Sequence, residues 1–304
     1  MSALDFSALY REERARLRRP ASASRPLAPL APIPGRAALL EVEAARGGGG
    51  ARAAPAASFL AEDSLVTCLE IEADRPAPVA LDGAPATIAY CGEFVSEEEE
   101  RALVEAAERA KGDWVSVRGR RLRRLGGPAG EAGFVAEPLP MWAAQLCAVV
   151  GAATVDVAYP NKNRTPNHVL ANAYDFDDEA KPFVFPHTDG PAYDDRTFTL
   201  SCGADCLVTF ARRLAPDEVG VVSPEPVCTV YLRRRSLLVF SGDAYTAHTH
   251  AIDAAAADTI DDTCANAALA SVKPGDVLDR RGVRHSFTLR RALAVPSVDP
   301  SGSN

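Results

Sequence analysis

The chain has 304 residues, of which 47% are hydrophobic and 24% charged, and this composition is typical of a globular protein. It has neither the run of about 18 apolar residues that a membrane span needs nor the apolar segment of a secretory signal, so we expect a protein without membrane contact. The net charge of −8 divides into +4 for residues 1–58 (nine arginines, five acids) and −12 for residues 59–304 (24 bases, 36 acids), so any nucleic-acid contact requires a local basic patch.

Residues 1–58 are predicted to be a mostly disordered extension. Residues 4–19 could form a short amphipathic helix, with a docking peptide as its functional alternative, but the stretch from Pro20 to Ser58 is rich in Ala, Pro, Gly and Arg and has no aromatic residue. Such a segment buries too little apolar surface to offset its ordering entropy. We therefore assign residues 59–304 to a single folded domain.

Residues 59–79 could contribute a strand or two, and the main ordered body of that domain is expected to begin at Ala86. Residues 86–95 predict a strand that leads into a helix from a Ser96 cap to about Ala110, whose first turn holds four glutamates, where the helix dipole favours acids. A second helix, which carries Trp142, is predicted over Pro138–Val150.

Between these helices lies the most basic segment of the chain, Arg118–Gly127. It has five arginines in seven residues and no acid. It reads either as a solvated hairpin or as a lid that contacts phosphates. The arginines are Arg118, Arg120, Arg121, Arg123 and Arg124.

From Val155 onward the pattern changes to short strands separated by turns. Helices followed by many short strands predict an α+β fold with a double-stranded β-helix (jelly-roll) core backed by helices. Whether the Ala- and Asp-rich residues 252–275 are ordered stays open. The predicted strands are His168–Ala173, Thr197–Gly203, Cys206–Ala211, Cys228–Arg233, Ser236–Ser241 and Val283–Arg291.

The seven cysteines are an odd number without a CxxC pair, which indicates free, mostly buried thiols in a reducing compartment, the cytoplasm or nucleus. Cys202 and Cys206 could be half of a metal site, but no second Cys/His pair has matching spacing. We therefore expect no structural zinc, and we expect a monomer.

A metal site is suggested instead by His187 and Asp189. Two residues apart on an extended segment, they project from the same side, and an imidazole with a carboxylate makes two-thirds of the 2-His-1-carboxylate facial triad of non-haem Fe(II) enzymes. The chain has four further histidines, His168, His248, His250 and His285, and one of them must supply the third ligand. His168 precedes the motif at the start of a strand and is interpreted as structural, whereas His248 and His250 share one strand face, so spacing alone does not separate them.

The last predicted strand places Arg284, Ser286, Thr288 and Arg290 on one face, opposite Phe287 and Leu289. Two inward guanidinium groups are costly unless they meet anions. A dicarboxylate co-substrate would supply those anions, and the arginine fork matches a carboxylate bidentately. Salt bridges to acids of the protein are the alternative.

Taken in order, Asn172-Ala173-Tyr174, His187-Thr188-Asp189, a later histidine and the segment Arg284–Arg290 resemble the AlkB-like Fe(II)/2-oxoglutarate dioxygenases. The similarity covers roughly residues 85–295 and is greatest to the group of the sixth vertebrate AlkB homologue. It implies Fe(II) ligands at His187, Asp189 and His250, with 2-oxoglutarate held by Asn172, Tyr174, Arg284 and Arg290, and with Ser286 and Thr288 as further pocket residues. The implied activity is oxidative demethylation of an N-methylated nucleobase in DNA or RNA, with O2 as co-substrate and the basic segment as a substrate lid.

One segment departs from the family pattern. The loop between Tyr174 and His187 is longer than expected and lacks the usual Gly-rich turn. Its acids, Asp175, Asp177, Asp178 and Glu179, would place negative charge near the site. They favour an alternative activity, a protein hydroxylase or demethylase. A non-catalytic nucleic-acid-binding protein with a vestigial iron site is the other alternative.

Overall fold

The computed structural model describes residues 71–293, except for 73–74, 86, 110–113, 118, 131–132, 135, 155–164, 191 and 214–225. The predicted extension over residues 1–58 and Arg118 therefore lie outside the described residues. None of the helices in the described part is long and apolar enough to cross a membrane.

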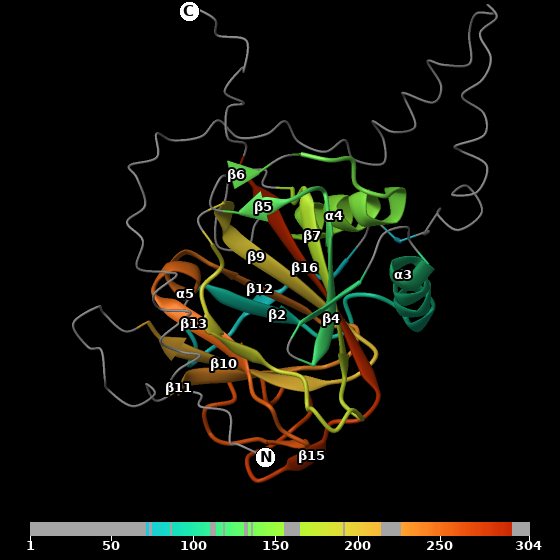
Figure 1. Ribbon diagram of the computed structural model, residues 1–304. Coiled ribbons are helices and arrows are strands. Elements are labelled where there is room, and N and C mark those ends of the chain that lie inside the picture. Colours follow the sequence, from blue (N-terminus) through green and yellow to red (C-terminus); the bar gives the residue numbers. More distant parts are fainter. Residues whose placement is uncertain are drawn as a thin grey trace, which may run out of the picture.

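Two antiparallel sheets face each other (Figure 1). The larger has eight strands in the order β1-β2-β12-β9-β16-β7-β4-β3, and the smaller has four in the order β11-β10-β13-β8. This arrangement confirms the predicted jelly roll. The bounds in the larger sheet are β1 Val79–Ala80, β2 Ile88–Cys91, β3 Val115–Val117, β4 Arg120–Leu125, β7 His168–Asp175, β9 Tyr193–Cys202, β12 Leu237–Ser241 and β16 Val283–Ala292. Those in the smaller sheet are β8 Val184–His187, β10 Cys206–Arg212, β11 Pro226–Leu232 and β13 His248–Ile252.

Two helices pack on the outer face of the larger sheet, as predicted. Helix α3 (Glu97–Arg109) begins with a capping box, in which the Ser96 hydroxyl accepts from the Glu99 amide at 3.2 Å and the Glu99 carboxylate accepts from the Ser96 amide at 2.7 Å. Helix α4 spans Met141–Ala153, so its predicted start at Pro138 was three residues early. The physical reason is Pro140, because a proline disfavours helical geometry in the residue before it.

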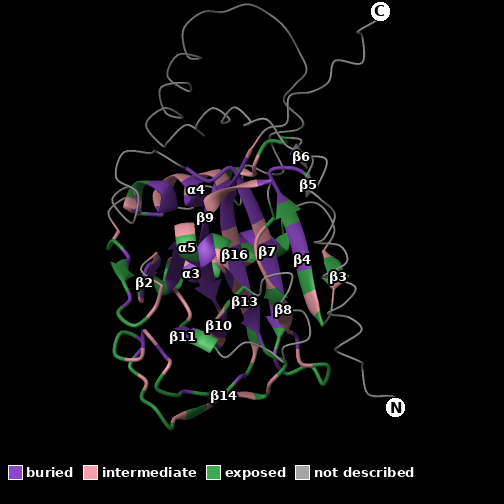
Figure 2. Ribbon diagram, turned by 90° about the vertical axis from the view of Figure 1, so that its left-hand side faces the viewer, coloured by how far each residue is buried: buried purple, intermediate pink, exposed green. Residues whose placement is uncertain are grey.

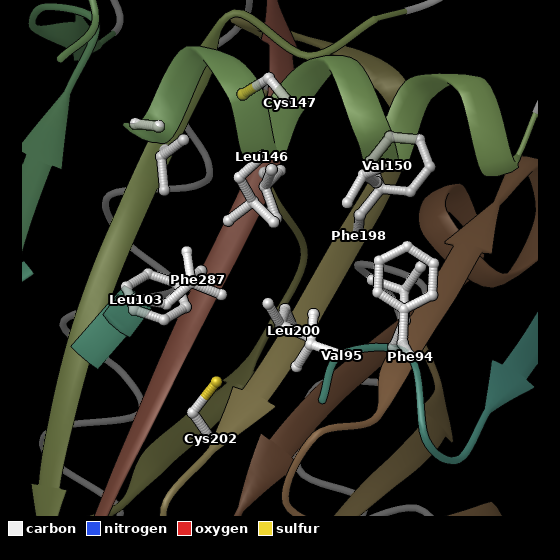
Figure 3. Packing of buried hydrophobic residues seen from close by; sticks show 14 of the residues in the cluster. Phe94, Val95, Leu103, Leu146, Cys147, Val150, Phe198, Leu200, Cys202 and Phe287 are labelled. Atoms are coloured by element: carbon white, nitrogen blue, oxygen red, sulfur yellow. The ribbon is translucent and has the colours of Figure 1, made fainter. Parts of the chain in front are cut away.

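The core forms two layers, one on each side of the larger sheet. Leu146 and Val150 of α4 pack on Phe198 of β9 and Phe287 of β16 (Figure 3). A second cluster, which includes Phe210, Leu238 and Phe240, fills the space between the sheets. Each central strand therefore has one face toward the helices and one face toward the other sheet, and Figure 2 shows these strands as largely buried.

The segment 252–275, whose order was left open, is folded. Strand β14 (Ala257–Thr259) pairs with β15 (Val277–Asp279), and the buried Asp258 carboxylate accepts from Arg280 Nε at 2.9 Å. The Asn266 side chain accepts from the Tyr231 amide and donates to the Tyr231 carbonyl oxygen, both at 2.8 Å. These contacts fasten the segment to β11. The remaining elements are β5 (Ala129–Gly130), β6 (Gly133–Phe134) and α5 (Gly242–Thr246).

Candidate active site

Three side chains of metal-ligand type converge between the two sheets. His187 ends β8, Asp189 follows it by two residues, and His250 lies in β13. Strands β8 and β13 are neighbours in which His187 and His250 are direct partners, with ring centroids 4.2 Å apart. Ligand atoms of all three residues lie within 4.8 Å of one another, so the group could hold one divalent cation.

His248, two residues before His250, is not part of this group. Its Nδ1 lies 3.1 Å from the carbonyl oxygen of Asp243. His168 is fully buried in β7 against the rings of Phe134 and Tyr193, at centroid distances of 6.1 and 5.3 Å. Of the four histidines outside the HxD motif, all of which the structure describes, His250 is therefore the one that the fold brings to His187 and Asp189.

The two histidines of the group are held in their neutral form. His187 Nδ1 lies 2.8 Å from the carbonyl oxygen of Phe185, and this acceptor requires the proton on Nδ1 and leaves the Nε2 lone pair for a metal. Burial lowers the pKa of His187. Burial, and then the neighbouring His187, lower the pKa of His250 to about 3. Neutral imidazole is the form that binds a metal.

Asp189 is held as an oriented carboxylate. Arg290 Nη1 donates to its Oδ1 at 2.7 Å, and Thr197 Oγ1 donates to its Oδ2 at 2.6 Å. Burial alone would raise the pKa of Asp189, but the Arg290 guanidinium, assisted by the hydrogen bond from Thr197, outweighs burial and holds that pKa well below its usual range. The carboxyl group is therefore ionised at neutral pH.

The site opens into a cavity between the sheets, walled by the inner faces of β7 and β16. Alternation places Phe287 and Leu289 in the helix-side core and the polar residues of β16 in the cavity. The structure thus brings all of the sequence-predicted co-substrate residues to one cavity together with the metal-ligand group. These residues are Asn172, Tyr174, Arg284, Ser286, Thr288 and Arg290.

Several buried polar atoms of this cavity have no hydrogen-bond partner among the described residues. Arg284 is 1% exposed; its Nη2 donates to Ser201 Oγ at 2.8 Å, but its Nε and Nη1 are unpaired. The Oδ1 of Asn172 is also unpaired. Buried unpaired donors cost free energy that an anionic ligand would recover. The cavity therefore fits a carboxylate ligand, and its histidine and aspartate donors fit Fe(II).

Strand β9 contributes residues that sequence analysis did not single out. Thr197 holds Asp189, Thr199 lines the cavity and Ser201 holds Arg284. The segment had been predicted as a strand. In its sequence, hydroxyl residues alternate with the apolar Phe198 and Leu200, and this pattern would have placed the three hydroxyl groups on one face of the strand.

The basic segment is divided between two faces of the larger sheet, because it forms β4 within that sheet. On the helix side, Arg121 pairs with Glu108 at 2.9 Å, and Arg123 Nη1 donates to the Ala107 carbonyl oxygen at 3.4 Å. On the opposite side, Arg120 lines the cavity and Arg124 is exposed. The hairpin alternative is confirmed, because β4 pairs with β3 and Arg121 and Arg124 are exposed, but Arg123 is buried against α3 rather than solvated.

No profile of a known protein family matches the chain. A zebrafish (Danio rerio) protein named probable RNA/DNA demethylase ALKBH6 is 32% identical over 221 residues, which cover 71% of this chain and 88% of that protein. The chain belongs to the AlkB-like Fe(II)/2-oxoglutarate-dependent dioxygenases. The AlkB-like chain is thus an oxidoreductase that uses Fe(II) and 2-oxoglutarate, and the His-Asp-His group and the unpaired Nε and Nη1 of Arg284 agree with this.

The chain's similarities to other proteins are weaker. The mouse (Mus musculus) tRNA (carboxymethyluridine(34)-5-O)-methyltransferase ALKBH8 is 25% identical over 233 residues, which are 72% of this chain and 32% of that protein. Among solved structures, OsALKBH1 matches with a TM-score of 0.42 and 14% identity, covering 68% of this chain and 99% of that one. A 2OG-Fe(II) oxygenase family oxidoreductase from Burkholderia pseudomallei matches with a TM-score of 0.43 and 12% identity, covering 68% of this chain and 88% of that one.

Proposed function

We propose that this dioxygenase removes a methyl group oxidatively from an N-methylated nucleobase in DNA or RNA. The observation that carries the proposal is the zebrafish relative named as an RNA/DNA demethylase, to which the chain is similar over 88% of that protein's length. A second observation agrees with it: the exposed Arg124 lies on the same face of β4 as the cavity-lining Arg120, and a cation there could contact a phosphate.

In this proposal His187, Asp189 and His250 hold Fe(II), and the cavity holds 2-oxoglutarate. Bound Fe(II), with O2 and 2-oxoglutarate, supplies the oxidising power, and 2-oxoglutarate leaves as succinate and CO2. Arg290 keeps Asp189 ionised and oriented, while the Phe185 carbonyl oxygen keeps the His187 ring in the tautomer that a metal requires. These contacts thus orient the metal-binding side chains before a metal ion or 2-oxoglutarate binds.

The two arginines of β16 suit the two ends of 2-oxoglutarate. Arg290 contacts the metal-ligand group, so it belongs with the 2-oxo acid end, which can chelate a divalent cation. Arg284 lies six residues further back on the same strand face, with two unpaired donors for the distal carboxylate. Asn172 and Tyr174 on the neighbouring strand line the space between them.

The acidic loop favoured a protein substrate, but most of its carboxylates have a structural role. Asp175 Oδ1 accepts from the Asp177 amide at 3.1 Å, Asp178 Oδ1 accepts from the Ala180 amide at 2.9 Å, and Asp177 Oδ2 accepts from the Gly282 amide at 3.1 Å. These bonds shape the loop and fasten it to the start of β16. Arg284 argues against the alternative of a vestigial iron site. Without an anionic ligand, the buried unpaired donors of Arg284 would only lower the stability of the fold.

The test is turnover on a panel of oligonucleotides that carry single N-methylated bases, in RNA and DNA, single- and double-stranded, since a base in a duplex must first be flipped out. We expect succinate, formaldehyde and loss of one methyl group by mass spectrometry, all abolished in His187→Ala. Metal-dependent 2-oxoglutarate binding with turnover only on peptides would move the substrate to proteins. A folded chain that binds no 2-oxoglutarate would leave only the vestigial alternative.

A further inference from the structure

Arg120, Tyr174 and Arg284 form a row across three neighbouring strands. In the register of the larger sheet, Tyr174 of β7 is paired with Arg120 of β4 on one side and with Arg284 of β16 on the other. Side chains of directly paired residues project from the same face of a sheet. All three line the same cavity, at the end of β16 away from Arg290.

Both guanidinium groups lie over the ring of Tyr174. Their Cζ atoms are 5.8 Å (Arg120) and 5.1 Å (Arg284) from the ring centroid. Arg120 Nη1 donates to the carbonyl oxygen of Phe183 at 3.4 Å, while its buried Nε has no partner in the described part of the chain. Arg120 and Arg284 thus flank Tyr174 from the two neighbouring strands, and each has at least one buried donor without a partner among the described residues.

Among the described residues no carboxylate lies within ion-pair distance of Arg120 or Arg284, whereas Arg290 at the other end of the cavity has Asp189. Two cations beside one aromatic ring repel each other. An anion that contacts both attracts each of them and makes the net electrostatic energy of the group favourable. A carboxylate has two oxygens and can accept from two arginines at once.

We propose that Arg120 binds the distal carboxylate of 2-oxoglutarate jointly with Arg284, so that the co-substrate links β4 to β16 across β7. The inference rests on the use of 2-oxoglutarate in the proposed function. It gives the basic segment two separate roles, because Arg120 faces the co-substrate while Arg124 remains exposed on the same face for the nucleic acid.

The test is anaerobic calorimetry on the full chain loaded with Mn(II), with 2-oxoglutarate and with 2-oxovalerate, which has the same carbon chain but no distal carboxylate. Arg120→Gln should weaken 2-oxoglutarate binding by about tenfold or more, the size expected for one charge-assisted hydrogen bond. Binding of 2-oxovalerate should not change. Arg124 lies four residues after Arg120 on the same face of β4, so Arg124→Gln is the matched control and should bind both ligands like the wild type.

Hydrogen exchange supplies a second readout that needs no turnover. 2-Oxoglutarate should slow exchange over residues 119–125 in the wild type and in Arg124→Gln, but not in Arg120→Gln. The inference is overturned if Arg120→Gln weakens both ligands equally, which would mean that Arg120 only shapes the cavity. It is also overturned if 2-oxoglutarate binding is unchanged while nucleic-acid binding falls, which would make Arg120 a phosphate contact. Failure of the wild type to bind 2-oxoglutarate would instead remove the proposed function itself.

Discussion

Arg290 donates from Nη1 to Asp189 Oδ1 over 2.7 Å, so an arginine predicted to hold the co-substrate also holds a candidate metal ligand. Its guanidinium further lies 4.0 Å from the centroid of the Tyr193 ring, which helps to fix its direction. We therefore expect metal binding and co-substrate binding to depend on one side chain.

Replacing Arg290 should impair both ligands. We expect Arg290→Ala to abolish 2-oxoglutarate binding and to weaken Mn(II) binding by about 10- to 100-fold, the usual effect of losing a residue that orients a ligand. Thr197→Val, which removes only the hydrogen bond to Asp189 Oδ2, should weaken Mn(II) binding without acting directly on 2-oxoglutarate. Calorimetry with each ligand measures both effects, and circular dichroism checks that the fold survives. Unchanged 2-oxoglutarate affinity in Arg290→Ala would refute the assignment.

The two neighbouring histidines of β13 should behave differently. His250→Ala should lose Mn(II) binding, because it removes one of three ligands. His248→Ala should keep it, because His248 hydrogen-bonds to the Asp243 backbone outside the metal-ligand group. Equilibrium dialysis with Mn(II) distinguishes the pair, and an effect of the same size in both variants would contradict the geometry of β13.

Gly203 should be intolerant of a side chain. Its φ is +82°, and a Cβ there would lie 2.2 Å from the carbonyl oxygen of Val283 at the start of β16. Gly83 is the matched control, with φ +76° and no atom within 4 Å of the same Cβ. Gly83→Ala should lower the free energy of unfolding by about 1–2 kcal/mol, the cost of left-handed geometry, and Gly203→Ala by clearly more. Urea denaturation measures both, and equal losses would rule out the close approach.

The buried cysteines should resist alkylation. Burial, and then Glu93, raise the pKa of Cys91 to about 11, and burial, with Cys264 nearby, raises the pKa of Cys228 to about 12. A raised pKa keeps the group as an unreactive thiol at every pH below it, so at pH 8 the thiolate fraction is very small. Mass spectrometry after iodoacetamide should find both unmodified in the native protein and modified in urea. Rapid native labelling of Cys228 would contradict its burial.

Arg124 should act on nucleic acid alone. Arg124→Glu should weaken binding of single-stranded RNA or DNA and reduce the salt dependence of that binding, because it replaces one phosphate contact by a repulsion. Arg121 pairs with Glu108 on the helix side, so Arg121→Gln should have a smaller effect. Fluorescence anisotropy at several salt concentrations provides the comparison, and equal effects would argue against the division of β4 into two faces.

The alternation of polar and apolar side chains along the strands explains why much of the site could be predicted. In β16 the sequence itself separates Arg284, Ser286, Thr288 and Arg290 from Phe287 and Leu289, and the structure has these two sets on opposite faces. The meeting of β8 with β13 could not be obtained in this way. It depends on pairing between strands 63 residues apart in sequence, and only the resemblance to a family indicated His250 over His248.

For the basic segment, local reasoning predicted a hairpin but not the burial of Arg123. Five arginines in seven residues look like a solvated surface, and nothing in their spacing reveals that Leu122 and Leu125 carry the strand into the larger sheet. Partners on the preceding helix α3, Glu108 and the Ala107 carbonyl oxygen, then neutralise or satisfy the arginines of one face. Tertiary contacts that composition cannot foresee decided this part of the fold.

The two-faced character of β16 limits how this gene can vary. Deleting or inserting one residue within the strand would shift every later side chain to the opposite face, so an arginine would enter the helix-backed core and a phenylalanine or leucine would enter the cavity. Folding and ligand binding would be lost in a single event. Descendants of this sequence should therefore accept substitutions along β16 but keep its length constant, and length changes should accumulate in the turns at its ends.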